Sequence, residues 1–216
     1  MTKKYQLKIC GINDLASLEF CLNYHYQPDF LGFIFYPKSP RNIDLNFAKK
    51  CNSYNFAKIK KVAVTVNASF AELAEIDKAL APDIIQLHGD EDLAYIKKLR
   101  TKFKGKISKA LGIATNTDLA KIATYQAEID YFLFDTKSTN YGGTGQKFDW
   151  KILAELNIDQ PYFLSGGLNS SNIHNAFQDT KAKYFDLSSG VELQKGIKDT
   201  KKIAEILDIF KQKNEA

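Results

Sequence analysis

Cysteine is scarce in this sequence, and its scarcity excludes two kinds of small-protein architecture. The chain has three cysteines, Cys10, Cys21 and Cys51, and they are widely spaced. Such a set forms neither a disulfide framework nor a zinc cluster. His25 and His174 lack companions at the spacing of metal ligands, so no metal site is expected. A chain without a disulfide pattern fits the reducing cytoplasm, which we predict as its location.

Long apolar segments are absent as well. The longest nearly uninterrupted apolar stretch, around Phe30 to Tyr36, is far shorter than the ~20 residues that span a bilayer. The first residues, Met1 to Gln6, include basic side chains, but no apolar segment follows them. A signal peptide is therefore not expected, and no membrane partner is predicted.

The sequence also lacks any concentration of positive charge. Its formal net charge is +5, its pI is near 8.9, and its lysines are scattered among acidic residues. A nucleic-acid-binding protein more often gathers its positive charge on one face. We therefore interpret the lysines as solvated side chains on helix surfaces and predict no nucleic-acid partner. A basic net charge also suits a small anionic substrate.

One compact domain is expected. The length of 216 residues and the 44% share of apolar residues suit a single domain over residues 1–216 with a sizeable core. The sequence leaves the oligomeric state open between monomer and homodimer.

What the sequence does contain is a repeated alternation of β-rich runs and amphipathic helical patterns. Runs such as Phe33-Ile34-Phe35 lack polar alternation, as strands covered on both faces do. The segment from Ser69 to Glu72 forms a capping box that predicts the start of a helix. The expected strands are Gln6–Cys10, Phe30–Phe35, Lys61–Val66, Ile84–Leu87, Ile107–Leu111, Tyr131–Asp135, Tyr162–Ser165 and Tyr184–Leu187.

Eight strand–helix units in this length predict an α/β fold, a single-domain (β/α)8 TIM barrel. An open doubly wound sheet is the alternative, but it usually has fewer strands and a glycine fingerprint after its first strand. The segment from Cys10 to Asn13 is not glycine-rich, so the barrel is favoured. In a barrel the C-terminal ends of all the strands converge on one face, where ligands bind.

Two glycine-bearing turns follow the last two expected strands. Gly166 and Gly167 follow the seventh strand, and Ser188, Ser189 and Gly190 follow the eighth. Small residues let backbone N–H groups approach an anion. Glycine can simply make a tight turn, but two such turns on neighbouring strands favour a phosphate site at these five residues.

A thiol and a carboxyl group end two other strands. Asp135 follows an apolar run, and low-dielectric surroundings of that kind raise a carboxyl pKa towards the range of a general acid. A turn or cap aspartate is the ordinary alternative. Cys10 is either an inert small hydrophobe or a reactive base. The first and sixth strands are three steps apart in an eight-membered ring, so the two side chains are placed to flank one molecule.

Three further segments are candidates for substrate contact. Arg41, in a loop stiffened by prolines, suits a carboxylate, although an ordinary surface arginine fits the local sequence equally well. His88 either polarises substrate or holds a loop by hydrogen bonds. The glycine-rich segment Tyr141–Gly145 is either a mobile lid or a slack surface loop. Cys21 and Cys51 are interpreted as packing residues.

With these strand-end residues, the chain resembles the phosphoribosylanthranilate isomerase family of tryptophan biosynthesis. One matching segment alone is weak, but together they are highly specific, because they run in order over nearly the whole chain. They are Lys8–Gly11, Gly32–Arg41, Gln86–Gly89, Asp135–Lys137, Tyr141–Gly145, Phe148–Trp150, Leu164–Leu168 and Asp186–Glu192.

The resemblance implies an Amadori rearrangement of N-(5-phosphoribosyl)anthranilate, the third step of tryptophan biosynthesis from chorismate. By motif, Asp135 is the general acid that protonates the ribose ring oxygen, and Cys10 is the general base at ribose C2. Arg41 then holds the anthranilate carboxylate, and the two late turns hold the phosphate. No metal or organic cofactor is implied, because the nitrogen of the substrate serves as the electron sink.

The chain departs from the family pattern at two places. Lys195 stands before Gly196 where the family usually has proline, which loosens a loop near the phosphate end. Ala63 and Thr65 stand where the family often has glycine and phenylalanine, which alters barrel packing or substrate contact. The alternatives are another phosphosugar barrel enzyme and a non-catalytic phosphate-ligand binder, and the retention of both Cys10 and Asp135 argues against the binder.

Overall fold

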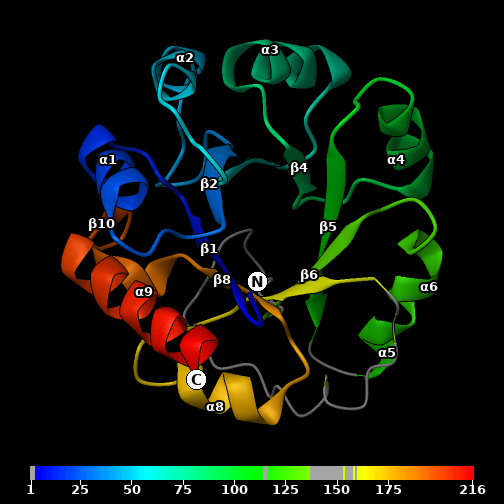
Figure 1. The fold of residues 1–216 in the computed structure, drawn as a ribbon. Coiled ribbons are helices and arrows are strands. Elements are labelled where there is room, and N and C mark those ends of the chain that lie inside the picture. The colour runs from blue at the N-terminus through cyan, green and yellow to red at the C-terminus, as the bar shows by residue number, and fades with distance from the viewer. Residues whose placement is uncertain (1–2, 114–115, 137–152, 154–157, 159) are drawn as a thin grey trace.

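Eight parallel strands close into a barrel. The computed structural model describes residues 3–113, 116–136, 153, 158 and 160–216. Each strand pairs in parallel with the next, and the last pairs back to the first (Figure 1). The strands are β1 (Gln6–Cys10), β2 (Phe30–Phe35), β3 (Lys60–Thr65), β4 (Ile84–Leu87), β5 (Lys106–Ile113), β6 (Tyr131–Thr136), β7 (Tyr162–Leu164) and β8 (Tyr184–Leu187).

The predicted (β/α)8 barrel is confirmed, with strand limits that differ by a few residues. β5 runs to Ile113 because Gly112 and Ile113 continue to pair with the end of β6. The predicted segments at Tyr141–Gly145 and Phe148–Trp150 lie outside the described residues.

Helices lie on the outside of the ring of strands (Figure 1). The expected capping box at Ser69 and Glu72 is present at the start of α3. Aspartate side chains cap the starts of α1, α2, α4 and α9. None of the helices in the described part of the chain is long and apolar enough to cross a membrane. The helices are α1 (Leu15–Asn23), α2 (Leu45–Asn52), α3 (Phe70–Leu80), α4 (Leu93–Arg100), α5 (Asn116–Leu119), α6 (Lys121–Tyr125), α8 (Ile173–Asp179) and α9 (Thr200–Glu215).

A small hairpin follows the barrel proper and was not predicted. After β8 the chain forms a short 3-10 turn, η1 (Ser189–Val191), and then two antiparallel strands, β9 (Glu192–Gln194) and β10 (Ile197–Lys198). These two strands lie outside the ring and form a separate sheet. The segment is too short and too polar to show the strand pattern that marks the barrel strands.

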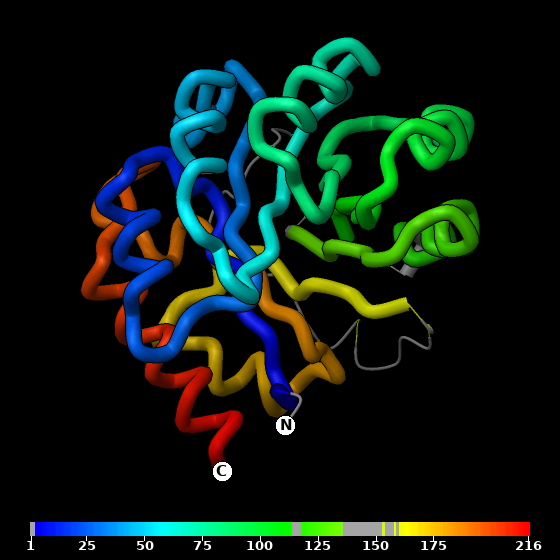
Figure 2. Tube along the Cα trace, turned by 45° about the horizontal axis from the view of Figure 1, so that its top comes forward, coloured from blue at the N-terminus to red at the C-terminus, as the bar shows by residue number. Residues whose placement is uncertain are grey.

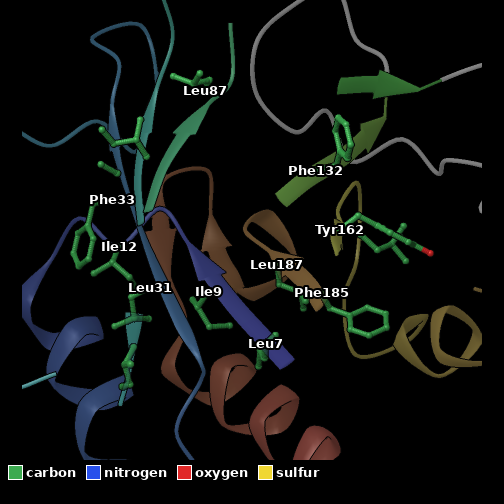
Figure 3. Packing of buried hydrophobic residues seen from close by; sticks show 14 of the residues in the cluster. Leu7, Ile9, Ile12, Leu31, Phe33, Leu87, Phe132, Tyr162, Phe185 and Leu187 are labelled. Carbon is green, nitrogen blue, oxygen red and sulfur yellow. The ribbon is translucent and has the colours of Figure 1, made fainter. Parts of the chain in front are cut away.

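Side chains alternate between the inside of the barrel and the helices, because successive residues of a strand point to opposite faces. Leu7 and Ile9 of β1 pack in the outer layer against the helices (Figure 3). Cys10 belongs instead to the cluster inside the barrel. On β3 the inner positions are Val62 and Val64.

The same alternation assigns the two departures on β3 to the outer side. Ala63 packs in the outer layer, and Thr65 is separated from it by one inward residue, Val64. Thr65 is buried, and its hydroxyl has no hydrogen-bond partner among the described residues. These departures therefore alter packing against the helices, while the pocket-lining residues of this segment are Val64 and Val66.

Aromatic side chains fill the N-terminal half of the barrel interior. Phe30, Tyr131 and Tyr184 are the first residues of their strands. The ring of Phe163 lies 5.1, 5.5 and 5.3 Å, respectively, from the centres of these three rings. This cluster closes one end of the barrel and leaves the C-terminal end for a pocket.

The two ends of the described chain lie close together (Figure 2). The backbone N–H of Tyr5 donates to Asn214 Oδ1 at 2.8 Å, and Asn214 Nδ2 donates to the Tyr5 carbonyl at 2.9 Å. The last helix, α9, is thereby fixed to the residue just before β1.

Replacing Phe163 by alanine should destabilise the fold strongly, because it removes the ring that contacts the other three aromatic side chains. We expect the free energy of unfolding to fall by ~3–5 kcal/mol in chemical denaturation. The matched control is Leu193→Ala on the hairpin, since Leu193 is 71% exposed and its loss should change stability by less than about 0.5 kcal/mol. Equal effects of the two changes would contradict this account of the core.

Candidate active site

A pocket lies at the C-terminal ends of the strands and contains most of the predicted site residues. Cys10, Arg41, His88 and Asp135 all line it, together with both late turns. The turn residues in its lining are Ser165, Gly166, Gly167, Leu168, Ser188 and Ser189. The structure thus brings together residues at or after the ends of six different strands.

Gly190 is the one predicted phosphate residue that is not in the pocket lining. A Cβ atom added to Gly190 would overlap the carbonyl oxygen of Leu168. The absence of a side chain at this position lets the turn after β8 lie directly against the turn after β7. Its contribution is the close approach of the two turns.

The turn after β7 needs glycine because of its backbone conformation. Gly166 and Gly167 have φ angles of +93° and +68°, in the left-handed region that disfavours other residues. The carbonyl of Gly167 accepts hydrogen bonds from Asn172 Nδ2 at 2.9 Å and Asn169 Nδ2 at 3.2 Å. The Gly167 carbonyl oxygen would repel a bound anion. These hydrogen bonds direct it to side-chain donors that follow in the same segment.

Cys10 shares the inside of the barrel with a buried ion pair. Lys8 lies two residues earlier on β1 and therefore on the same face, and its Nζ is 3.0 Å from Oδ1 of Asp186. Gly32 faces them from β2, where an added Cβ would lie 2.8 Å from Cys10 Sγ and 3.2 Å from Lys8 Cε. Only glycine leaves room for the thiol and the lysine together.

The surroundings of Cys10 favour its protonated form. Burial raises the pKa of the thiol, the ammonium of Lys8 opposes that shift, the carboxylate of Asp186 adds to it, and Lys198 opposes it again. The net result is a pKa above the ordinary value for cysteine. A thiolate at this position is therefore a minor species at neutral pH and a strong base when it forms.

His88 lies between Gln86 and Asp135. Its Nδ1 is 3.1 Å from Gln86 Nε2, and its Nε2 is 3.8 Å from Oδ2 of Asp135. Burial, followed by the positive charges of Lys8 and Lys109, lowers the pKa of His88 to about 4. The imidazole is thus neutral at pH 7, and its Nε2 faces the carboxylate of Asp135.

Lys109 lies within β5 and is not among the described residues that line the pocket. Its Nζ donates to the Gly89 carbonyl at 2.6 Å and to Glu91 Oε2 at 2.8 Å. Glu91 also accepts hydrogen bonds from the backbone N–H groups of Asn67 and Gly89. This buried pair holds the loops after β3 and β4 against each other.

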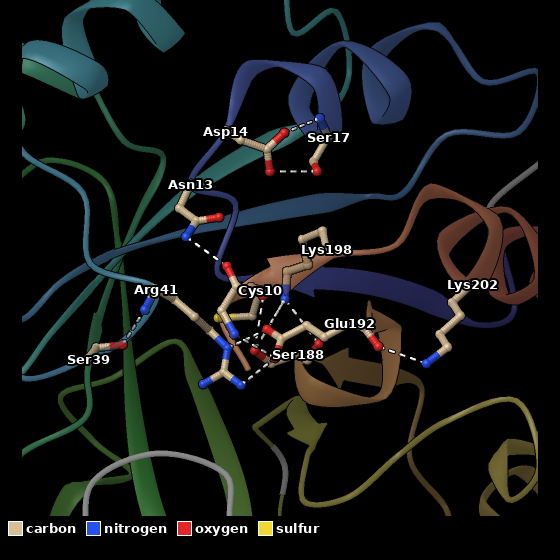
Figure 4. Close-up of polar contacts among 11 residues, drawn as sticks. Cys10, Asn13, Asp14, Ser17, Ser39, Arg41, Ser188, Glu192, Lys198 and Lys202 are labelled. Atoms are coloured by element: carbon tan, nitrogen blue, oxygen red, sulfur yellow. Dashed lines mark hydrogen bonds and ion pairs between the residues drawn. The ribbon is translucent and has the colours of Figure 1, made fainter. Parts of the chain in front are cut away.

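Arg41 is held by a buried carboxylate (Figure 4). Its Nε and Nη2 donate to the two oxygens of Glu192 at 2.5 and 2.8 Å. Burial lowers the pKa of Arg41, but the hydrogen bond and charge of Glu192 outweigh it and raise the pKa. Arg41 is a buried residue at the edge of the pocket, so it is not an ordinary surface arginine.

Sequence reasoning missed four charged residues around the site: Lys8, Asp186, Glu192 and Lys198. Lys8 had a usable signal, because it is two residues from Cys10 on the same strand and so faces the same side. Asp186 and Glu192 lay inside a recognised segment without an assigned role. Lys198 had no signal, since it belongs to the unpredicted hairpin. Within the described residues, no cluster of His, Cys, Asp and Glu could hold a metal ion.

The comparisons with known proteins agree on one family. Residues 7–209 match the family model described as N-(5'phosphoribosyl)anthranilate (PRA) isomerase. The N-(5'-phosphoribosyl)anthranilate isomerase of Nitrobacter hamburgensis is 40% identical over 205 residues, which cover 93% of this chain and 90% of that protein.

Solved structures give the same result. Phosphoribosyl anthranilate isomerase from Thermotoga maritima superposes with a TM-score of 0.87 at 30% identity, over 96% of this chain and 99% of that one. A phosphoribosyl anthranilate isomerase in complex with reduced 1-(o-carboxyphenylamino)-1-deoxyribulose 5-phosphate superposes with a TM-score of 0.81 at 27% identity, over 96% and 99% of the two chains.

Acid should destabilise the protein through His88. Its pKa is about 4 in the fold and about 6.5 in an unfolded chain, so only the unfolded state gains a proton between these values. Stability is then present above pH 6.5 and is lost as the pH falls towards 4. We expect the free energy of unfolding to drop by about 2 kcal/mol from this group between pH 7 and pH 5.

Urea denaturation of the wild type and His88→Gln at both pH values measures this contribution. The variant should lose about 2 kcal/mol less than the wild type on acidification. The control is His25→Gln, because His25 lies away from the pocket and is largely exposed. An unchanged pH dependence in His88→Gln would contradict a neutral, half-buried imidazole.

Proposed function

Because the chain belongs to the N-(5'-phosphoribosyl)anthranilate isomerase family, we propose that its pocket performs that isomerisation with Cys10 and Asp135 as base and acid. The reaction converts N-(5-phosphoribosyl)anthranilate to 1-(2-carboxyphenylamino)-1-deoxyribulose 5-phosphate. It is an Amadori rearrangement, an internal oxidation and reduction in which the substrate gains and loses no atoms. The observation that supports these roles is that Cys10 and Asp135 line one pocket with Arg41 and both late turns.

The first step is ring opening. Asp135 donates a proton to the ribose ring oxygen, and the bond between that oxygen and C1 breaks as the nitrogen lone pair forms a C=N⁺ bond. A general acid must be protonated before it acts. Asp135 is the penultimate residue of β6 and directly follows the buried residues Leu133 and Phe134.

The second step is removal of the proton from C2. The thiolate of Cys10 takes it, and the bonding electrons move to form C1=C2 while the positively charged nitrogen becomes neutral. The resulting enolamine then tautomerises to the ketone, as its C2 hydroxyl loses a proton and C1 gains one. Burial raises the thiol pKa and so lowers the thiolate fraction at neutral pH, whereas the positive charges of Lys8 and Lys198 oppose that rise and favour the reactive form.

We assign each end of the substrate to groups of opposite charge or suitable geometry. Glu192 occupies Nε and Nη2 of Arg41, and we assign Nη1 to the anthranilate carboxylate. The phosphate is assigned to the turns at Gly166, Gly167, Ser188 and Ser189, with Gly190 allowing their close approach. We assign His88 an auxiliary contact with the substrate, as a neutral donor next to Asp135.

The partner of this protein is thus one small phosphoribosyl compound. A relative with 27% identity binds a reduced carboxyphenylamino-deoxyribulose phosphate, which supports a ligand of this class. We place the reaction in the cytoplasm, because the three buried cysteines are all free thiols and Cys10 must stay reduced to act.

Loss of either reacting group should reduce turnover without unfolding the barrel. For Cys10→Ser and Asp135→Asn we expect turnover to fall by ~10²–10⁴-fold each, the usual contribution of a positioned acid or base. Turnover is followed by the loss of anthranilate fluorescence when phosphoribosylanthranilate is supplied.

Matched controls are Cys51→Ala in α2 and Asp44→Asn at the N-cap of that helix, neither of which lines the pocket. Both should keep turnover close to wild type. Near-wild-type turnover in either active-site variant would refute its assigned role. No fluorescence loss with the wild type at high enzyme concentration would refute the isomerase function.

Arg41→Lys should weaken substrate binding more than it slows the chemistry. A lysine can still pair with Glu192, but it cannot present a second planar edge to a carboxylate. We expect KM to rise about 10–100-fold, as for the loss of a charge-assisted hydrogen bond, with a smaller change in kcat. Steady-state kinetics measures both, and an unchanged KM would contradict the carboxylate assignment.

A further inference from the structure

Lys198, in the unpredicted hairpin, is a buried lysine that the proposed chemistry does not use. Its side chain is 0% exposed, and it is not among the described residues that line the pocket. A buried charge is a costly way to fill space, because its desolvation must be offset by several good contacts. Its contacts therefore indicate what it does (Figure 4).

One of these contacts leads to the carboxylate-binding arginine. Lys198 Nζ donates to Glu192 Oε1 at 2.9 Å, and the same oxygen accepts Arg41 Nε. Glu192 Oε2 accepts Arg41 Nη2 and the backbone N–H of Gly196. Glu192 is thus held on both sides, and the plane of the Arg41 guanidinium follows from the position of this carboxylate.

The other contacts lead to the phosphate-binding turn. Lys198 Nζ donates to the Ser188 carbonyl at 3.0 Å and lies 3.5 Å from Ser188 Oγ. Ser188 Oγ donates in turn to the Cys10 carbonyl at 3.1 Å. One ammonium group therefore contacts the turn after β8, which is joined to the strand end that carries the thiol.

The hairpin that carries Lys198 is itself fixed to the loops that follow β1 and β2. Asn13 Nδ2 donates to the Gly196 carbonyl at 2.9 Å. Gly196 has a φ angle of +85°, and a Cβ added there would lie 2.6 Å from the carbonyl oxygen of Pro40. The chain must have glycine at 196 for the hairpin to lie against the loop of Arg41, whereas Lys195 at the preceding position leaves this contact intact.

From these contacts we propose that Lys198 is a positioning residue that holds the carboxylate-binding Arg41 and the phosphate-binding turn at Ser188 in one rigid frame. It acts through Glu192 at one end and through the Ser188 carbonyl at the other, and it does not touch the substrate. This inference rests on the function proposed above, because it takes the two ends of the substrate from it. An apolar side chain of the same length would fill the space without joining the two ends.

The experiment measures the two ends of the site separately. In Lys198→Met we expect the dissociation constants of inorganic phosphate and of anthranilate, each titrated by NMR, to rise about tenfold. KM for phosphoribosylanthranilate should rise more than either constant alone, since both ends contribute to it, and kcat should change by less than KM. In Arg41→Lys the anthranilate constant should rise while the phosphate constant stays at the wild-type value.

The matched control is Lys202→Met. Lys202 Nζ donates to the backbone carbonyl of Glu192 at 2.7 Å but does not reach its carboxylate or Ser188. We expect both dissociation constants to stay at the wild-type value in this variant. Lys198→Gln, which keeps a polar group but cannot reach both ends, is measured in parallel and replaces Lys198→Met if that variant does not fold.

The outcomes separate this inference from the proposed function. Both constants unchanged in a folded Lys198 variant, or only one of them raised, would overturn the coupling role. An equal rise of both constants in Lys202→Met would also overturn it, because any change in the hairpin would then suffice. A wild type that binds phosphate but never consumes phosphoribosylanthranilate would refute the isomerase function instead.

Discussion

The pairing of β8 with β1 is the contact on which the rest of the molecule depends. It closes the ring and so brings the C-terminal ends of all eight strands to one face. Lys8 and Asp186 are direct partners in this pairing, and their side chains form an ion pair inside the barrel. The same closure lets Ser188 Oγ reach the Cys10 carbonyl. An open sheet with these strands would have the residues of the site at separate edges.

Among the described residues, three buried lysines surround the pocket, and each is paired with one carboxylate: Lys8 with Asp186, Lys109 with Glu91, and Lys198 with Glu192. None of the three is among the described residues that line the pocket. Positive charge therefore acts on the pocket from behind its walls. It opposes the protonation of His88 and the rise in the pKa of Cys10. Among the described residues of the lining, Arg41 is the one cation. Arg41 is thus placed to contact an anionic ligand, whereas the three lysines act on the pKa values of pocket groups.

The barrel was predictable, and so was the meeting of most of the proposed site residues at one pocket, because both follow from patterns of short range. Apolar runs at regular intervals predicted eight strands. Once a barrel was assumed, residues near the strand ends, such as Cys10 and Asp135, could be identified as candidates for the pocket. The hairpin was not predictable, since it is held by contacts with residues distant in sequence, such as that of Glu192 with Arg41 and that of Gly196 with Asn13. The interpretation of Gly190 illustrates the same limit. A glycine in a turn predicts an anion site, but contact with Leu168 becomes visible only when the neighbouring turn is placed.

The hydrogen bonds between Tyr5 and Asn214 place the beginning of β1 beside the last turn of α9. That junction lies at the opposite end of the barrel from the pocket, because β1 runs from Gln6 towards Cys10. Chain ends that meet at the surface away from a site tolerate covalent rearrangement well. The barrel is therefore suited to circular permutation, with old ends joined by a short linker, and to fusion with another domain without obstructing ligand entry.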